Sequence, residues 1–467
     1  MGHFLPRQVL LWKAAISPRN CNFIARALST EAQADECKKP AKNYDIIIAG
    51  GGLVGTSLAC SIGKHKTLAD KSVLLLEGRQ KFKGFKCETY SNRVSAINHS
   101  SVKLMKSIGA WNGIESARYK AVKQIQVWDA NSDAMITFNH DNFADDVAYI
   151  VENDLILDAV YKELEKCSNV EVRNLSKIER VMLPKNGAAK STVYLKDGSE
   201  FMCELLVGAD GFNSVVRKQM NINTYTTNYN QFGLVANVEL TDAGDNSVAW
   251  QRFTPTGPVA LLPLNDTMSS LVWSTTPARA KELQSMKPEE FVDALNDAFL
   301  KVYPKDNVVT NALSMIDSFM GGSTRSIRQY PPRVKNVLKG SRASFPLGFL
   351  HASSYIDEGV ALIGDAAHRI HPLAGQGVNL GFGDVSCLTE LLAELVYAGF
   401  KLDDKNNLAK YERERLVNNV PLMVGVHGLH NLYSTTFSPV VLLRSLGLQI
   451  TQNMTPLKKI FMERAMG

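Results

Sequence analysis

The pattern of apolar and polar residues predicts short buried strands that alternate with turns and helices. Four continuous apolar runs have the length and the branched residues of buried strands, and helical patterns follow three of them after a glycine-containing turn. Strand, turn and helix in this order indicate an α/β fold. The four runs are residues 44–49, 72–76, 204–208 and 360–364.

Length and composition indicate a globular protein of more than one domain. A chain of 467 residues is several times the usual domain size of about 100–200 residues, so we expect two or three domains. Hydrophobic residues make up 45% and charged residues 21%, which leaves little room for long disordered tracts.

The first thirty residues differ from the rest of the chain in charge. They hold four bases and no acid among scattered apolar residues, and without them the formal charge falls from +6 to +2. This make-up is typical of a mitochondrial transit peptide, which we expect at residues 1–30; a frayed tail is the alternative. Bases and acids are interspersed in the remainder, which argues against nucleic-acid binding.

The turn after the first strand reads GxGxxG, with Gly50, Gly52 and Gly55. These glycines permit a tight turn, the approach of a helix N-terminus to a pyrophosphate, and close packing of helix and strand. Glu77 ends the next strand, where a carboxylate accepts hydrogen bonds from adenosine ribose hydroxyls and repels a 2′-phosphate. The pattern predicts FAD or NAD; the alternative is a plain turn beside a solvated Glu77.

The third apolar run leads into a turn with Asp210 and Gly211, followed by a short helix. A glycine turn before a helix is suited to a second approach of the backbone to a nucleotide. The alternative is that Asp210 caps an ordinary helix.

The fourth apolar run ends at Asp365, which can bond a ribityl chain, and a Gly- and Pro-rich loop then leads to a helix predicted at 382–399. Gly375, Gly377 and Gly381 allow backbone N–H groups to reach a planar ligand, and the helix dipole there favours negative charge. A reduced isoalloxazine carries negative charge near N1 and C2=O, so this segment favours a flavin.

Three other polar residues and the cysteines receive no definite binding role from the pattern. Arg93 is a strong donor before an apolar stretch, with a surface salt bridge as the alternative. His368 and His371 stand three residues apart in a loop without a third ligand nearby in sequence, so no metal site is expected. The seven cysteines include no CxxC pair, which argues against zinc or a disulfide framework and fits a reducing compartment such as the mitochondrial matrix.

Together these segments resemble the FAD-dependent aromatic-ring hydroxylases, the flavoprotein monooxygenases whose type member hydroxylates p-hydroxybenzoate. Within that family the chain is most similar to the ubiquinone-biosynthesis monooxygenases. The likeness extends over about residues 44–420, and the segments that carry it, besides the glycine motifs, are 88–95, 149–154, 250–253, 257–264 and 368–381.

The resemblance implies a role for each matching residue. The GxGxxG glycines and Glu77 would hold the ADP half of FAD, Arg93 would meet its flavin side, and Glu152 stands near an adenosine-side contact of relatives. Asp210 and Gly211 would form the second nucleotide contact, and Asp365 would bind the ribityl or pyrophosphate region. The isoalloxazine would be lined by Pro372, Gly375, Gln376, Gly377, Val378 and Asn379.

The resemblance also implies a domain order. A Rossmann-like FAD-binding domain would be interrupted by an inserted mixed α+β substrate domain and followed by a C-terminal helical segment. Strand-like pieces at 124–128 and 269–274 fit the sheet of the inserted domain. The implied bounds are 44–120, 150–220 and 340–415 for the FAD domain, 121–149 and 221–339 for the substrate domain, and 416–467 for the C-terminal segment.

The implied reaction is hydroxylation of a polyprenylated 4-hydroxybenzoate or related phenol by O2, through a C4a flavin hydroperoxide. Such chemistry needs positioning and exclusion of water more than acid or base catalysis, so no catalytic residue is assigned. The mitochondrial branch of the family implies electrons from a ferredoxin and its reductase, with NADPH upstream, and a complex with other ubiquinone-biosynthesis proteins. No second GxGxxG with its own strand and acid exists for NADPH.

From Leu416 onward the chain is apolar, and its four Lys and Arg residues face a single acid, Glu463. No run reaches the length of a membrane span, so we expect a helical segment on the matrix side of the inner membrane or on a partner, with a docked helix pair as the alternative. The sequence leaves two rival functions open: a flavin dehydrogenase or prenyl reductase of the same fold, and a non-enzymatic prenyl-binding protein.

Overall fold

The computed structural model describes residues 41–132, 134–139, 145–184, 187, 189–241, 244–303, 311 and 329–454. The predicted transit peptide at 1–30 lies outside these ranges, as does the end of the predicted C-terminal segment. The fold described below is that of the unit that begins at Asn43.

An eight-stranded sheet contains all four predicted strands. Its order is β18-β19-β11-β1-β2-β8, and β10 and β9 extend it beside β11. The pairs β1·β2, β2·β8 and β11·β19 are parallel, as expected for strands joined through helices. The strands are β1 (Lys42–Ala49), β2 (Val73–Leu76), β8 (Val170–Arg173), β9 (Ile178–Met182), β10 (Ser191–Leu195), β11 (Glu200–Gly208), β18 (Ile356–Asp357) and β19 (Val360–Leu362).

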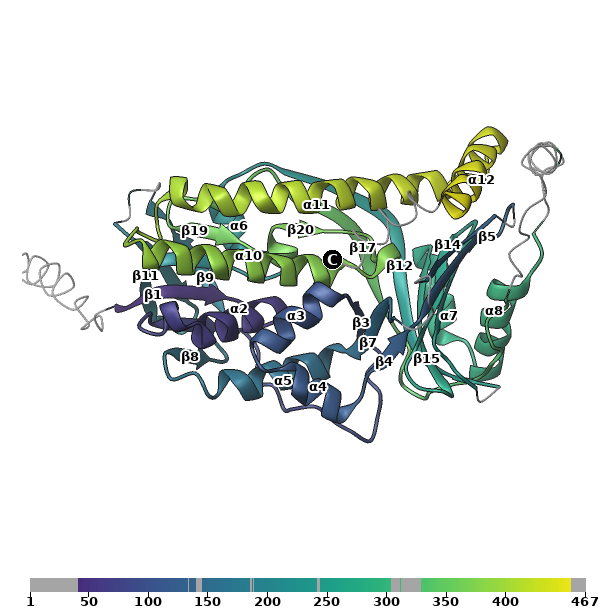
Figure 1. Cartoon of the computed structure of the whole chain (residues 1–467), viewed down its shortest axis with the longest axis horizontal. Coiled ribbons are helices and arrows are strands. Elements are labelled where there is room, and N and C mark those ends of the chain that lie inside the picture. Colours follow the sequence, from purple (N-terminus) through teal and green to yellow (C-terminus); the bar gives the residue numbers. More distant parts are fainter. Residues whose placement is uncertain are drawn as a thin grey trace, which may run out of the picture. The chain divides into compact units, whose positions relative to one another are not determined.

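Helices α2 and α10 pack closely beside this sheet, and α11 lies along α10 (Figure 1). A Cβ at Gly381 of α10 would lie 2.5 Å from Val54 Cγ2 of α2, so glycine allows the two helices to touch. Side chains of the central strands, such as Ile46 and Leu74, have no exposed surface in this core. The helices of this region are α2 (Leu53–Lys64), α5 (Asn153–Leu164), α6 (Val215–Met220), α10 (Gly377–Tyr397) and α11 (Lys405–Tyr433), with 3-10 turns η1 (Lys66–Leu68), η3 (Gly364–Ala366) and η4 (Pro372–Ala374).

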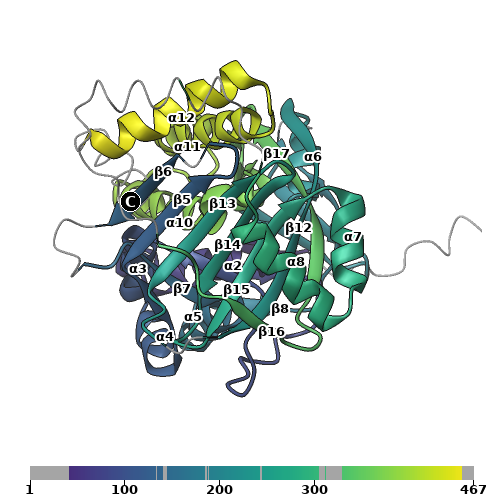
Figure 2. The same ribbon diagram turned by 90° about the vertical axis from the view of Figure 1, so that its right-hand side faces the viewer.

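A nine-stranded sheet of order β20-β17-β12-β15-β14-β13-β5-β6, with β16 beside β12, forms a second layer whose face is covered by α7 and α8 (Figure 2). Phe299 of α8 packs on Trp128 of β5 with ring centroids 6.1 Å apart. The elements are β5 (Gln124–Asp129), β6 (Met135–Asn139), β12 (Thr224–Leu240), β13 (Val248–Thr254), β14 (Gly257–Pro263), β15 (Met268–Thr275), α7 (Pro277–Ser285), α8 (Pro288–Leu300), β16 (Val334–Val337), β17 (Ala343–Ala352) and β20 (His368–Arg369).

A small three-stranded sheet of order β3-β7-β4 adjoins two short helices. These elements are β3 (Val94–Ile97), α3 (His99–Ser107), α4 (Trp111–Ala117), β4 (Lys120–Val122) and β7 (Ala148–Glu152). The last described helix, α12 (Ser438–Asn453), is held to β5 by Arg444, whose Nε lies 2.8 Å from Asp129 Oδ2.

The expected α/β fold class is confirmed, and the strands predicted at 124–128 and 269–274 are β5 and β15. The domain bounds stay a prediction. The proposed bound at residue 340 falls between β16 and β17, and both of these strands pair with β12 in one sheet. In the described part of the chain no helix is long and apolar enough to cross a membrane.

Candidate active site

The turn after β1 brings α2 against the end of the strand. Gly50 has a φ of +110°, and a Cβ there would lie 2.4 Å from the carbonyl oxygen of Ala209; a Cβ at Gly55 would lie 1.9 Å from that of Gly50. Side chains at either position would therefore collide with backbone. By contrast, nothing lies within 4 Å of a Cβ at Gly52, and α2 begins after it without a side-chain cap. The N-terminal N–H groups of α2 are thus available to an anion.

Glu77 lies directly beside this turn. Its Oε2 accepts a hydrogen bond from Gly51 N at 2.9 Å, and its Oε1 accepts one from Arg79 N at 2.8 Å. A carboxylate has about four acceptor positions, so both oxygens retain lone pairs for a ligand hydroxyl. The structure brings Glu77 to the GxGxxG turn, and its contact with ribose stays a prediction.

Asp210 and Gly211 follow β11 on the other side of the same turn. Asp210 Oδ2 accepts hydrogen bonds from Val215 N at 2.6 Å and Val216 N at 3.3 Å, which is the helix contact considered as the alternative. Its Oδ1 is buried and has no hydrogen-bond partner among the described residues, and burial raises the pKa of this carboxyl. Gly211 has a φ of +77° with nothing within 4 Å of its Cβ position. A buried carboxylate oxygen without a partner calls for an explanation, and a hydrogen-bond donor on a ligand at this turn would supply one.

Asp365 lies in η3 and stays accessible to solvent. Burial by the surrounding protein atoms raises the pKa of its carboxyl, while electrostatic interaction with His368, Arg369 and Arg93 lowers it. Arg93 is exposed at the start of β3, and no acid in the described ranges forms an ion pair with it. Arg93 and Asp365, each predicted separately to contact the cofactor, therefore interact electrostatically.

The loop at 372–379 ends at the N-terminus of α10. Gly375 adopts a φ of +61°, and nothing lies within 4 Å of a Cβ at Gly377. Neither a capping side chain nor an acid occupies the first turn of α10, where Val378 is half-buried. Pro372 begins η4 just before this turn. This helix end carries a positive partial charge that no side chain of the described residues offsets.

Asn379 and Gln376 hold the loop in place. Asn379 Oδ1 accepts hydrogen bonds from Asn98 N at 3.1 Å and Ser101 Oγ at 2.7 Å. Its Nδ2 donates to Ala96 O and to Gln376 Oε1, both at 2.9 Å. The predicted isoalloxazine loop is thus anchored to β3 and α3 by a buried amide.

Glu152 lies at the start of α5 with only 3% of its surface exposed. Arg118 donates to both of its oxygens, at 2.7 and 3.1 Å, and Ser91 N donates to Oε1 at 2.5 Å. The carboxylate thus fixes the segment before β3, and its predicted adenosine contact stays a prediction.

A pocket of about 370 Å³ adjoins the loop at 372–379. It is lined by the bulge of β12, the β13–β14 hairpin, Leu373 of the loop and the last turn of α11. None of the described residues that line it is Asp, Glu, Lys or Arg. Phe253 and Tyr433 form an aromatic wall with stacked rings 3.8 Å apart. The pocket therefore suits an uncharged aromatic group.

His371 lies behind this pocket without exposed surface. Leu373 N donates to its Nδ1 at 3.2 Å, so its Nε2 carries the proton and donates to Gln231 Oε1 at 3.2 Å. Burial and the nearby His430 lower the pKa of His371 to about 3, and burial with His427 lowers that of His430 to about 4. Both imidazoles are neutral near pH 7.

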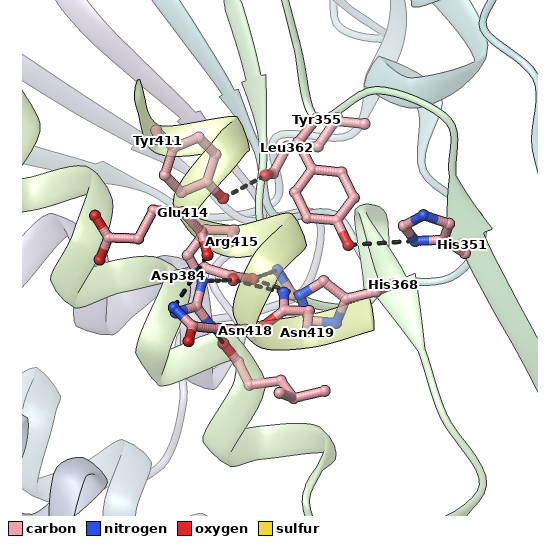
Figure 3. A network of polar contacts seen from close by, with 12 residues as sticks. His351, Tyr355, Leu362, His368, Asp384, Tyr411, Glu414, Arg415, Asn418 and Asn419 are labelled. Carbon is pink, nitrogen blue, oxygen red and sulfur yellow. Dashed lines mark hydrogen bonds and ion pairs between the residues drawn. The ribbon is translucent and has the colours of Figure 1, made fainter. Parts of the chain in front are cut away.

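His368, three residues earlier, belongs to a charged network with Asp384 and Arg415 (Figure 3). This network and the pocket residues Tyr229 and His430 were not predicted from the sequence. A lone acid inside the apolar stretch around Asp384 was the available signal, because such a residue needs a buried partner.

The described residues fit FAD. The three elements expected to bind it offer an unsatisfied carboxylate oxygen at Asp210 and uncapped N-termini of α2 and α10. They also leave open space at the Cβ positions of Gly52, Gly211 and Gly377. The described residues contain no group of three or more His, Cys, Asp or Glu that could hold a metal ion.

Comparison with known proteins identifies the family. The sequence matches the FAD binding domain family over residues 43–314 and 340–420. It is 60% identical over 447 residues to the ubiquinone biosynthesis monooxygenase COQ6, mitochondrial, of Drosophila melanogaster, covering 95% of this chain and 92% of the relative. The human protein of the same name is 47% identical over 429 residues, covering 90% and 92%.

Solved structures agree on the fold. The crystal structure of p-nitrophenol 4-monooxygenase PnpA from Pseudomonas putida DLL-E4 superposes with a TM-score of 0.66 at 15% identity, covering 91% of this chain and 99% of that one. PqsL, a probable FAD-dependent monooxygenase from Pseudomonas aeruginosa, gives 0.64 at 21% identity, covering 88% and 100%. The chain belongs to the FAD binding domain family and, within it, to the family of the mitochondrial ubiquinone biosynthesis monooxygenases COQ6.

Proposed function

We propose that this chain is an FAD-dependent monooxygenase that hydroxylates the aromatic ring of a polyprenylated 4-hydroxybenzoate or related phenol in ubiquinone biosynthesis. The observation that carries the proposal is the 60% identity to a relative named as a ubiquinone biosynthesis monooxygenase, of which 92% is covered. The pocket without charged residues beside the predicted flavin loop is consistent with it.

The predicted site residues would divide the work of holding FAD. Gly50, Gly52, Gly55 and Glu77 would bind the ADP half, and Asp210 would bind through its unsatisfied Oδ1. The remaining contacts would come from Gly211, Arg93, Asp365 and the loop from Pro372 to Asn379. Bound FAD supplies the activation of O2, and the protein supplies binding, orientation and exclusion of water.

The pocket beside Leu373 would receive the substrate ring. The stacked rings of Phe253 and Tyr433 provide an apolar wall, and neutral donors and acceptors such as Gln231 lie at its edge. Neutral His430 would accept a hydrogen bond from a phenol without attracting an anion. A ring held there adjoins the loop that we assign to the isoalloxazine.

The outer face of α11 and α12 would contact the matrix side of the mitochondrial inner membrane. Between Leu416 and Met454 the only Asp, Glu, Lys or Arg is Arg444, which is buried against Asp129. The same helix α11 lines the pocket, so a polyprenyl tail would pass from lipid to pocket along it. The exposed apolar residues of this face are Val417, Val424, Leu429, Phe437, Leu443 and Ile450.

Sedimentation with cardiolipin-containing vesicles tests this face. We expect Leu443→Asp to reduce the bound fraction, because a charge there would enter the lipid interface. Tyr397→Asp is the control, since Tyr397 is 88% exposed on α10 outside this face. Equal binding of both variants and the wild type would contradict the assignment.

Electrons would come from a ferredoxin and its reductase, with NADPH upstream, in a complex with other ubiquinone-biosynthesis proteins. The lack of a second GxGxxG unit in the sequence supports an external donor. Residues 1–30 would direct import and be removed.

Analysis of quinone intermediates tests the function. Cells lacking the protein should accumulate a polyprenylated phenol that lacks the additional ring hydroxyl group. The structure of the accumulated compound identifies the ring position that the enzyme hydroxylates. The wild type should restore the product, whereas Gly52→Val should not, because its side chain would occupy the space left for the pyrophosphate. Gly244→Val, on an exposed loop with equally open space, is the matched control. Normal quinone levels without the protein would refute the proposal.

A further inference from the structure

Asp384 of α10 is a buried carboxylate with partners on both sides (Figure 3). Its Oδ2 accepts hydrogen bonds from Gly364 N at 2.9 Å and His368 Nε2 at 2.6 Å. Its Oδ1 accepts from Arg415 Nε at 2.8 Å and Asn419 Nδ2 at 3.3 Å. One side chain thus joins the η3 loop to two helices.

The carboxylate is ionised in spite of its burial. Burial alone would raise the pKa of Asp384, but His368, Arg415 and the Gly364 N–H lower it to about 2. An ionised carboxylate only accepts hydrogen bonds, so His368 carries its proton on Nε2 and donates it. The orientation of the His368 ring is therefore fixed by Asp384.

The two partners of Asp384 in the η3 loop lie on either side of Asp365 in the sequence. Gly364 precedes Asp365 and His368 follows it by three residues, so one carboxylate holds both ends of the η3 turn. Val54 of α2 confines the turn from another side, 3.2 Å from a Cβ at Gly364. With both ends fixed, the accessible Asp365 carboxylate has little freedom to move.

Arg415 completes the arrangement. The Arg415 guanidinium, whose Nε lies 2.8 Å from Asp384 Oδ1, neutralises this buried anion. Gly383 makes room for it, since a Cβ there would lie 2.6 Å from Arg415 Nη2. The loop is thereby held without placing net negative charge behind the cofactor site.

We propose that Asp384, through His368 and the Gly364 N–H, is a positioning residue that fixes Asp365 for binding FAD. The inference rests on the proposed assignment of Asp365 to the FAD site. It assigns a role in cofactor affinity to residues that do not touch the cofactor.

The test measures the Kd of FAD for apoprotein by flavin fluorescence, together with the unfolding midpoint. His368→Ala should weaken FAD binding by about tenfold, the lower end of what is lost when a residue that orients a binding side chain is removed. His368→Gln, which keeps an N–H donor, should recover most of the affinity. Tyr411→Phe is the control: it removes a buried hydrogen bond to Leu362 O beside the network without touching Asp384. It should lower the midpoint and leave the Kd within about twofold.

Asp365→Ala separates this inference from the proposed site. Weaker binding in Asp365→Ala and in His368→Ala, with wild-type affinity in Tyr411→Phe, is the expected result. Weak binding in Asp365→Ala alone would overturn the positioning role of Asp384 and leave the site intact. Wild-type affinity in Asp365→Ala would overturn both. A Kd that follows the midpoint equally in all variants, including Tyr411→Phe, would show a merely structural role and overturn the inference.

Discussion

Two histidines three residues apart occupy opposite electrostatic environments. His368 donates to the ionised Asp384 at 2.6 Å in a network that also contains Arg415. His371 is equally buried, but it lies among neutral groups and its pKa is lowered to about 3. The sequence presents both as histidines of one Gly- and Pro-containing loop.

The difference shows how one short loop serves two partners. The charged side faces the Asp365 turn, where a carboxylate must be held firmly. The neutral side faces the pocket, where a charged group would pay a desolvation cost and disfavour an apolar ring. The N-terminus of α10, at Gly377, follows both histidines in the sequence and belongs to neither environment.

The largest expected effect comes from removing the charge of the first region. Asp384→Asn leaves the buried Arg415 without its counter-ion, which typically destabilises by about 3–5 kcal/mol. Urea denaturation of the purified protein measures the change in the free energy of unfolding. The control is Glu394→Gln on the same helix, whose ion pair with Lys410 is exposed and screened by solvent, so that its loss should change stability little. A loss for Asp384→Asn no greater than for this control would contradict the network.

The second prediction concerns the neutral region and pH. The folded pKa of His371, about 3, lies below the ordinary value of 6.5, so as pH falls below about 6.5 the unfolded state binds a proton that the folded state does not. Above pH 6.5 this group therefore leaves the free energy of unfolding unchanged. Below pH 6.5 the free energy of unfolding decreases by about 1.4 kcal/mol for each unit by which the pH falls. His371→Leu should flatten the stability profile between pH 6 and 4.5 by up to that slope.

Denaturation at several pH values, on wild type and His371→Leu, measures this slope. A parallel pair of profiles would mean that His371 is protonated in the folded state and that the pocket wall is charged.

The smallest effect is expected outside both regions, at the N-terminus of α10. Gly377→Asp has open space for its side chain, and its carboxylate should disfavour the negative charge that a flavin gains on reduction. A helix-end charge of about 0.3–1 kcal/mol corresponds to a two-electron potential lower by about 6–21 mV. Spectroelectrochemical titration measures it. An unchanged or higher flavin reduction potential in the FAD-loaded variant would mean that this helix end does not face the flavin pyrimidine.

The local backbone motifs could be predicted from the sequence because glycine and strand patterns are short-range signals. Gly50 and Gly55 pack as the GxGxxG pattern implies, and the four apolar runs are strands of one sheet. The start of α10 was wrong by five residues, since the helix begins at Gly377 rather than near Phe382. Its glycines suggested a loop, but Gly381 and Gly383 are helical positions that make room for Val54 and Arg415.

The polar partners could not be predicted because they come from distant parts of the chain. Asp384 meets Arg415 from the next helix, and Asn379 meets Asn98 across nearly 300 residues of sequence. Tyr229 and His430 approach within 4.2 Å between ring centroids only after β12 and α11 have packed. No spacing rule relates such pairs, whereas folding of both layers brings them together.

The most direct test of the central claim is oxygen-isotope labelling of the reaction. Purified FAD-loaded enzyme, a chemical or ferredoxin reductant and a polyprenylated 4-hydroxybenzoate are incubated under ¹⁸O2, and the product is analysed by mass spectrometry. A monooxygenase should place one ¹⁸O atom in the new ring hydroxyl of each product molecule. A product formed without ¹⁸O, as a dehydrogenase or prenyl reductase would give, would contradict this claim.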